Sequence, residues 1–118
     1  MDAILVVDDE PNVRFLVRMI LEGAGYAVVE ASHGGDALEC AKESRPGLVV
    51  TDLMMPVMGG RELIERLRAD PDTAAIPIVV LSTSAGSLTT SADIVLGKPF
   101  KPEVLVEAVG LLAGKGGN

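Results

Sequence analysis

The sequence predicts an α/β fold in which five parallel strands form a doubly wound sheet. Short apolar runs rich in β-branched residues recur along the chain, and such runs are typical of parallel strands that are buried on both faces. Segments with apolar residues at helical spacing alternate with these runs. The connections are too short for anything other than right-handed βαβ crossovers. At 118 residues, the chain has the length of one domain.

The first half of the chain supplies three predicted strands and two predicted helices. Residues 3–7 form the first strand, and Pro11 can begin a helix because proline is tolerated in a first helical turn. This helix carries apolar residues at helical spacing and is ended by Gly23 and Gly25: Val13, Leu16, Val17 and Ile20. The next elements are a strand at 26–31, a helix at 34–44 with Ala37, Leu38 and Ala41 facing inward, and a strand at 48–50.

The second half follows a loop rich in Met, Pro and Gly. Leu63, Ile64 and Leu67 predict a helix over 62–69, which Asp70-Pro71 closes. Apolar runs predict strands at 76–81 and 94–96, and a last helix is expected over 102–113. Residues 1–113 are therefore expected to form the domain, and 114–118 a flexible, glycine-rich tail.

Composition excludes several classes of function. Seventeen acidic residues against ten basic ones give a net charge of −7, which argues against direct binding to nucleic acid or to an anionic membrane. The single cysteine excludes an internal disulfide and a cysteine-rich zinc site. No apolar run approaches the roughly 20 residues of a membrane span, and the first residues lack the basic region of a signal peptide. We therefore expect a soluble cytoplasmic domain.

Polar side chains follow the predicted strands at the points where they end. They are Asp8, Asp9 and Glu10 after the first strand, Asp52 after the third, Ser82 and Thr83 after the fourth, and Gly97, Lys98 and Pro99 after the fifth. In doubly wound sheets, ligands bind beyond the carboxyl ends of the strands. We expect these side chains to converge at that edge.

The types of side chain at this edge indicate a chemistry. Close carboxylates repel one another, so such a cluster is stable only when it takes up protons or a cation. Oxygen ligands without His or Cys favour Mg²⁺ over Zn²⁺. A cation and an ammonium group neutralise the oxygens of a phosphoryl group, and a carboxylate can attack its phosphorus as the nucleophile.

Four motifs resemble those of the receiver (REC) domain of two-component response regulators, either stand-alone or as an isolated domain. They are Val7-Asp8-Asp9-Glu10-Pro11, Thr51-Asp52-Leu53-Met54-Met55-Pro56, Val80-Leu81-Ser82 and Gly97-Lys98-Pro99-Phe100. The resemblance covers almost the whole chain. It implies a flavodoxin-like sheet with the strand order 2-1-3-4-5.

The resemblance also implies a role for each matching residue. Asp52 would accept a phosphoryl group from the phosphohistidine of a sensor histidine kinase or phosphotransfer protein. Lys98 would pair with Asp52 at rest and with a phosphoryl oxygen afterwards. Ser82 would move to hydrogen-bond the phosphoryl group, and the Lys98–Pro99 peptide bond would be cis.

Magnesium is the cofactor that the resemblance implies. Asp9 would bind Mg²⁺ directly and Asp8 through water. Asp52 and the backbone carbonyl of Met54 would complete the protein ligands.

The sequence departs from the receiver pattern between the fourth and fifth strands. Only 16 positions separate Ser82 from Lys98, about a turn and a half of helix fewer than in a typical receiver. The segment 84–93 is rich in Ser, Thr and Gly, which favour turns over helix interiors, so the fourth helix is expected to be shortened or missing. Val95 stands where receivers often carry a switching aromatic, and Thr83 where a small residue is usual.

Three functions are compatible with these observations to different degrees. The first is a phosphorylation-dependent switch that catalyses only its own phosphorylation and dephosphorylation and controls a downstream protein or output domain. The second is a receiver-like interaction module in which the shortened fourth segment has altered or abolished switching. An aspartyl-phosphate hydrolase is disfavoured because such sites carry Asp-x-Asp, whereas Leu53-Met54 follows Asp52.

Three further features of the sequence are candidates for a functional role. His33 lies in a Ser-His-Gly-Gly turn and is not expected to act in phosphotransfer, and Cys40 is expected to be a small buried hydrophobe. On the last helix, Val104 and Leu111 fall outside the stripe that can face the sheet. Either the Ser- and Thr-rich segment covers them, or they form an exposed patch that binds a partner or a second copy of the chain as a homodimer.

Overall fold

The computed structural model describes residues 2–53, 55, 58–83 and 92–116. Five parallel strands form one sheet in the order β2-β1-β3-β4-β5, which confirms the predicted fold and strand order. The strands are β1 (Ile4–Val7), β2 (Val28–Ala31), β3 (Leu48–Asp52), β4 (Ile78–Ser82) and β5 (Ile94–Gly97). The helices are α1 (Pro11–Gly23), α2 (Gly34–Ser44), α3 (Gly60–Ala69) and α4 (Pro102–Gly116).

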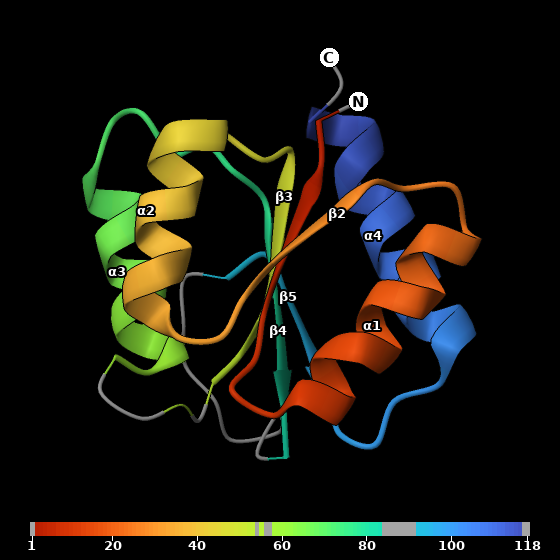
Figure 1. Ribbon diagram of the computed structural model, residues 1–118. Coiled ribbons are helices and arrows are strands. Elements are labelled where there is room, and N and C mark those ends of the chain that lie inside the picture. The colour runs from red at the N-terminus through yellow and green to blue at the C-terminus, as the bar shows by residue number, and fades with distance from the viewer. Residues whose placement is uncertain (1, 54, 56–57, 84–91, 117–118) are drawn as a thin grey trace.

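The sheet is a middle layer between two pairs of helices. Helices α1 and α4 cover one face, and α2 and α3 cover the other (Figure 1). Strand β1 shows the alternation that this arrangement requires, because Ile4 and Val6 pack toward α1 and α4 while Leu5 and Val7 pack toward α2 and α3. The three central strands β1, β3 and β4 are therefore buried on both faces, while the edge strands β2 and β5 are only partly buried.

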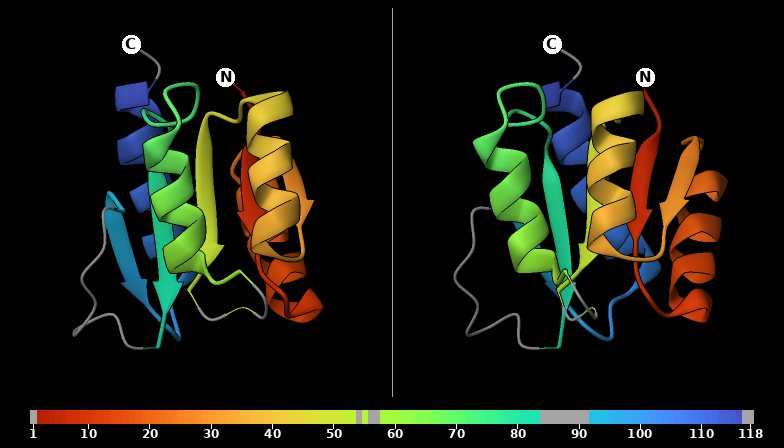
Figure 2. Two further views of the ribbon diagram at one scale, coloured as in Figure 1. Left: turned by 90° about the vertical axis from the view of Figure 1, so that its left-hand side faces the viewer. Right: turned by 60° about the vertical axis from the view of Figure 1, so that its left-hand side comes forward.

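The register of the sheet aligns the carboxyl ends of its strands. Val7 lies beside Thr51, Asp52 beside Leu81, and Ser82 beside Gly97. All strand arrows point to the same edge of the sheet (Figure 2). The residues that follow the strands are consequently gathered at one edge, as the sequence predicts.

Two strands begin two residues later than predicted, and backbone hydrogen bonds explain why. The Tyr26 N–H donates to the Leu21 carbonyl (3.1 Å), and Gly25 has a φ of +97°, so these residues finish the turn that ends α1. The Ile76 N–H donates to the Thr73 carbonyl (3.1 Å), which places Ile76 in a turn before β4. Both residues supply apolar packing without belonging to the strand.

The helices also differ from the prediction in detail. α3 begins at Gly60, two residues earlier than expected, and α4 continues to Gly116 instead of ending at Ala113. On α1, Leu16 is exposed, and Val17 and Leu21 are the fully buried residues. The wide apolar spacing of α1 therefore supplies both a buried face and an exposed one, with Phe15 and Met19 also exposed.

The predicted packing of α4 is confirmed. Its buried residues are Leu105, Ala108, Val109 and Leu112. Val104 and Leu111 are 43% and 62% exposed, respectively. The described residues do not extend to 84–91, so the predicted shortening of the fourth helix and the cover over these two side chains lie outside them.

Asp93, just before β5, forms hydrogen bonds to Ile78 of β4 through both its backbone and its side chain. The Asp93 N–H donates to the Ile78 carbonyl (2.9 Å), and the Asp93 carboxylate accepts from the Ile78 N–H (2.8 Å). Arg68 of α3 donates to the same carboxylate (2.8 Å) and to the carbonyls of Ala74 and Ile76. This network fixes the edge strand from the α3 side.

In the described part of the chain, no helix has the length and apolar character needed to cross a membrane.

Candidate functional site

Three carboxylates and one ammonium group meet at the carboxyl edge of the sheet. Oxygens of Asp8, Asp9 and Asp52 all lie within 4.8 Å of one another. Lys98 Nζ lies 3.0 Å from Asp52 Oδ1 and 3.6 Å from Asp8 Oδ2. Asp8 and Asp9 follow β1, Asp52 is the last residue of β3 and Lys98 follows β5. The aligned strand ends therefore bring together side chains that are distant in sequence.

Asp8 combines burial with an incomplete set of hydrogen bonds. Its side chain is almost fully buried, and Oδ1 accepts the Glu10 N–H at 2.9 Å. Oδ2 has no hydrogen-bond partner among the described residues, since Lys98 is too distant for one. Burial raises the pKa of the Asp8 carboxyl, and the negative charges of Asp52 and Asp9 add to this, while the Glu10 N–H and Lys98 oppose it. The charged form of Asp8 is therefore disfavoured in the absence of a cation.

These observations fit a hard cation such as Mg²⁺. The three carboxylates supply only oxygen ligands, and one of them, Asp8, has a buried oxygen without a hydrogen-bond donor among the described residues. A divalent cation would compensate the buried negative charge of Asp8 and the repulsion from Asp52 and Asp9, which together raise the Asp8 pKa. The predicted fourth ligand, the carbonyl of Met54, lies outside the described residues.

Ser82 and Lys98 are joined through the backbone at this edge. The Lys98 N–H donates to the Ser82 carbonyl at 2.9 Å, and the Ser82 side chain is buried. The Lys98–Pro99 peptide bond is cis, as the resemblance implies. Thr83, the next residue along, is exposed beside the site.

The backbone behind Asp52 is fixed by a glycine and a buried threonine. Thr51 Oγ1 donates to the Asp52 carbonyl (2.8 Å), and the Gly60 N–H donates to the Leu53 carbonyl (2.9 Å). A Cβ atom at Gly60 would lie 2.8 Å from the Leu53 Cα and would overlap the Asp52 carbonyl oxygen. Only glycine allows α3 to begin so close to the third strand.

His33 and Cys40 lie outside the carboxylate cluster. His33 caps α2, because its Nδ1 accepts the Asp36 N–H at 3.2 Å. Cys40 is partly buried, not fully buried as expected, and its Sγ lies 3.4 Å from Ser44 Oγ. The contacts of both residues are made within α2 or at its start.

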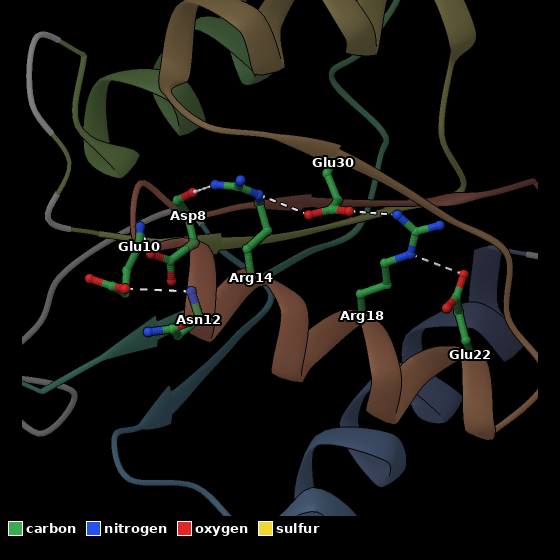
Figure 3. Close-up of polar contacts among 7 residues, drawn as sticks. All are labelled: Asp8, Glu10, Asn12, Arg14, Arg18, Glu22 and Glu30. Carbon is green, nitrogen blue, oxygen red and sulfur yellow. Dashed lines mark hydrogen bonds and ion pairs between the residues drawn. The ribbon is translucent and has the colours of Figure 1, made fainter.

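A network on α1 reaches the site and was not predicted from the sequence. Arg14 Nη1 donates to the backbone carbonyl of Asp8 at 2.7 Å, and Arg14 Nε donates to Glu30 Oε1 of β2 at 2.8 Å (Figure 3). Arg18 donates to the other oxygen of Glu30 at 2.5 Å and to Glu22 at 3.1 Å. The spacing of Arg14 and Arg18 on one face of a helix was visible in the sequence, but their shared acceptor was not.

The sequence matches the family model of the response regulator receiver domain over residues 4–110. It is 39% identical over 116 residues to the DNA-binding response regulator MtrA of Mycolicibacterium smegmatis, an alignment that covers 90% of this chain and 48% of MtrA. The chain thus spans about half the length of this relative.

Solved structures agree with the sequence matches. The chemotaxis response regulator CheY4 of Vibrio cholerae is 32% identical with a TM-score of 0.85, covering 95% of this chain and 98% of that chain. The receiver domain of the sensor histidine kinase PA1611 of Pseudomonas aeruginosa is 26% identical with a TM-score of 0.90, covering 96% and 98%. The PA1611 structure contains a magnesium ion coordinated in its active site cleft.

Proposed function

The chain belongs to the response regulator receiver domain family, and on that basis we propose that it is a phosphorylation-dependent signalling switch with Asp52 as the phosphoacceptor. The observation that carries this proposal is the position of Lys98 Nζ, 3.0 Å from Asp52 Oδ1, beside two further carboxylates. An ammonium group at this distance orients the Asp52 carboxylate, and it can follow the negative charge onto a phosphoryl group.

The proposed reaction is a transfer between two side chains. An Asp52 oxygen attacks the phosphorus of a phosphohistidine, and the P–N bond breaks as the P–O bond forms. The imidazole nitrogen then takes a proton from water. Lys98 pairs with a phosphoryl oxygen, and the Ser82 hydroxyl donates a hydrogen bond to another. Asp8, Asp9, Asp52 and the Met54 carbonyl would hold Mg²⁺, which supplies charge neutralisation at the phosphoryl oxygens.

The proposal also assigns partners. A sensor histidine kinase or phosphotransfer protein would supply the phosphoryl group in the cytoplasm, and the chain would catalyse only its own phosphorylation and dephosphorylation. A downstream protein, an output domain or a second copy of the chain would bind the switched state. The exposed apolar residues Val104 and Leu111 on α4 offer a surface for such a partner.

Intact-mass measurement after treatment with acetyl phosphate and Mg²⁺ tests the function. We expect the wild-type chain to gain one phosphoryl group and Asp52→Asn to gain none, because the amide is not a nucleophile for this transfer. Asp72→Asn is the matched control, since Asp72 is exposed and lies outside the carboxylate cluster. It should label as the wild type does.

Each other outcome contradicts the proposal in a different way. Labelling of Asp52→Asn would show that the phosphoacceptor is another residue. A wild-type chain that gains no phosphoryl group would favour the interaction module. Continuous release of phosphate over many turnovers would indicate a hydrolase.

A further inference from the structure

Arg14 connects three parts of the fold at the position of the carboxylate cluster. Its guanidinium group extends from α1, donates to the Asp8 carbonyl at 2.7 Å and donates to Glu30 of β2 at 2.8 Å. Its side chain is only 20% exposed. In Figure 3, the Arg14 side chain lies between Asp8 and Glu30, with each contact made by a different nitrogen.

Glu30 is bound by two arginines, one at each carboxylate oxygen, so it is an ordered partner for the Arg14 guanidinium group. Arg18 binds the second Glu30 oxygen at 2.5 Å. The hydrogen bond from Arg18, followed by that from Arg14, lowers the pKa of the Glu30 carboxyl. Glu30 therefore stays ionised at neutral pH and keeps its two charge-assisted bonds.

The hydrogen bond to the Asp8 carbonyl connects the Arg14–Glu30–Arg18 network to the carboxylate cluster. The Asp8 N–H donates to the Ala31 carbonyl at 3.2 Å, and Asp8 Oδ1 accepts the Glu10 N–H at 2.9 Å. Together with the bond from Arg14, these contacts fix the backbone on both sides of the Asp8 side chain. Asp9 follows directly in the same turn, so its carboxylate shares this constraint.

We propose that Arg14 is a positioning residue for the cation site, which holds the Asp8–Asp9 turn in the geometry that binds Mg²⁺. This inference rests on the proposed function and deepens it, because it assigns the affinity of the site partly to a residue that donates to no carboxylate of the cluster. Groups that orient metal ligands commonly contribute about tenfold or more to metal affinity.

Electrostatics alone predicts the opposite effect of removing Arg14. A cation beside a carboxylate cluster repels Mg²⁺, so its loss by itself would strengthen metal binding. If Arg14 positions the turn, its loss weakens metal binding despite the lost repulsion. The sign of the change therefore separates positioning from simple charge.

The test measures Mg²⁺ dissociation constants by calorimetry at fixed ionic strength for the wild type, Arg14→Met and Arg18→Met. Arg18→Met is the matched control, because it removes the same charge and a bond to the same Glu30 but no bond to Asp8. We expect about a tenfold weaker affinity for Arg14→Met. Arg18→Met should change the affinity less than twofold, because Arg14 still binds both Glu30 and the Asp8 carbonyl in that variant.

A second readout is made without metal. Hydrogen exchange of the Glu10 amide, which donates to Asp8 Oδ1, should accelerate in Arg14→Met and stay unchanged in Arg18→Met. A role confined to global stability would change the melting temperatures of both variants without changing the Mg²⁺ affinity of the folded protein.

The outcomes also separate this inference from the proposed function. If wild-type protein binds Mg²⁺ and Arg14→Met binds it equally or more tightly, the positioning role is wrong and the site assignment survives. A wild-type protein that does not bind Mg²⁺ would overturn the proposed metal site, and the positioning role with it.

Discussion

The environment of the Asp8 side chain disfavours its ionised form. Its buried Oδ2 has no hydrogen-bond partner among the described residues, and two other carboxylates lie within 4.8 Å. Because its pKa is raised in the folded state, ionised Asp8 lowers stability at neutral pH. Protonation or a bound cation removes this cost.

This conflict predicts the effect of Asp8→Asn. The amide keeps the size of the side chain and the oxygen that accepts the Glu10 N–H, but it removes the buried charge. In the presence of a chelator, we expect the melting temperature to rise by several degrees. The increase that Mg²⁺ produces in the wild type should be lost or strongly reduced, because ligand binding stabilises only what it binds.

Thermal melts with and without millimolar Mg²⁺ check both parts, again with Asp72→Asn as the control. A lower melting temperature for Asp8→Asn without metal would mean that its contact with Lys98, 3.6 Å away, outweighs the repulsion. An undiminished response to Mg²⁺ would mean that Asp8 does not contribute to the cation site.

At the scale of elements, the junction between β3 and α3 leaves no room for a side chain. A Cβ atom at Gly60 would lie 2.8 Å from the Leu53 Cα, in the segment directly after Asp52. Backbone atoms cannot rotate away as a flexible side chain can. The start of α3 and the position of Asp52 are therefore linked.

Gly60→Ala is expected to lower the free energy of unfolding by about 1–3 kcal/mol, because the backbone must shift to admit the methyl group. Gly23→Ala is the matched control, since no heavy atom lies within 4 Å of its added Cβ. At that position alanine should raise the free energy of unfolding by up to about 1 kcal/mol, because glycine is a poor helix former. Urea denaturation measures both, and equal effects of the two substitutions would exclude a role for steric overlap.

The elements could be predicted where burial alone determines them. β1, β3 and β4 are buried on both faces, so their apolar runs were sufficient evidence. The starts of β2 and β4 could not be predicted, because backbone hydrogen bonds to Leu21 and Thr73 place Tyr26 and Ile76 in the turns before these strands. The exposure of Leu16 depends on which part of a wide apolar helix face meets the sheet, and helical spacing does not determine that.

The same distinction applies to the candidate site. Asp8, Asp9, Asp52 and Lys98 could be predicted because each lies at or just beyond the end of a strand, and parallel strands end at one edge. The Arg14 contact could not be found, because its acceptor is a backbone carbonyl that has no signature in a sequence. The roles of these residues in phosphotransfer remain the prediction that the mass measurement tests.

For the whole molecule, lowering the pH should change stability through two carboxylates, and their effects on stability are opposite: Glu30 destabilises the fold as it is protonated, and Asp8 stabilises it. Glu30 has a lowered pKa, so its ion pairs stabilise the fold above its ordinary pKa of 4.5, and this stability is lost as the pH falls through the folded-state pKa. Asp8 has a raised pKa, so its contribution improves as the pH falls.

Glu30→Gln separates the two contributions. At neutral pH the variant should be less stable than the wild type, because Arg14 and Arg18 lose a charged partner. The difference should shrink as the pH is lowered below the ordinary pKa of 4.5 and Glu30 of the wild type becomes protonated as well. Urea midpoints across this interval measure the difference, and a constant gap between the two proteins would contradict the assignment of the acid response to Glu30.

The strand order has a consequence for how the domain assembles during synthesis. β1 is synthesised first and lies between β2 and β3 in the sheet, whereas β4 and β5 are synthesised last and extend the β3 side. Asp8 and Asp52 are therefore synthesised with β1 and β3, whereas Lys98 follows only the last strand. A nascent chain that stops before β5 holds two neighbouring carboxylates without their ammonium partner, so completion of the site coincides with completion of the sheet.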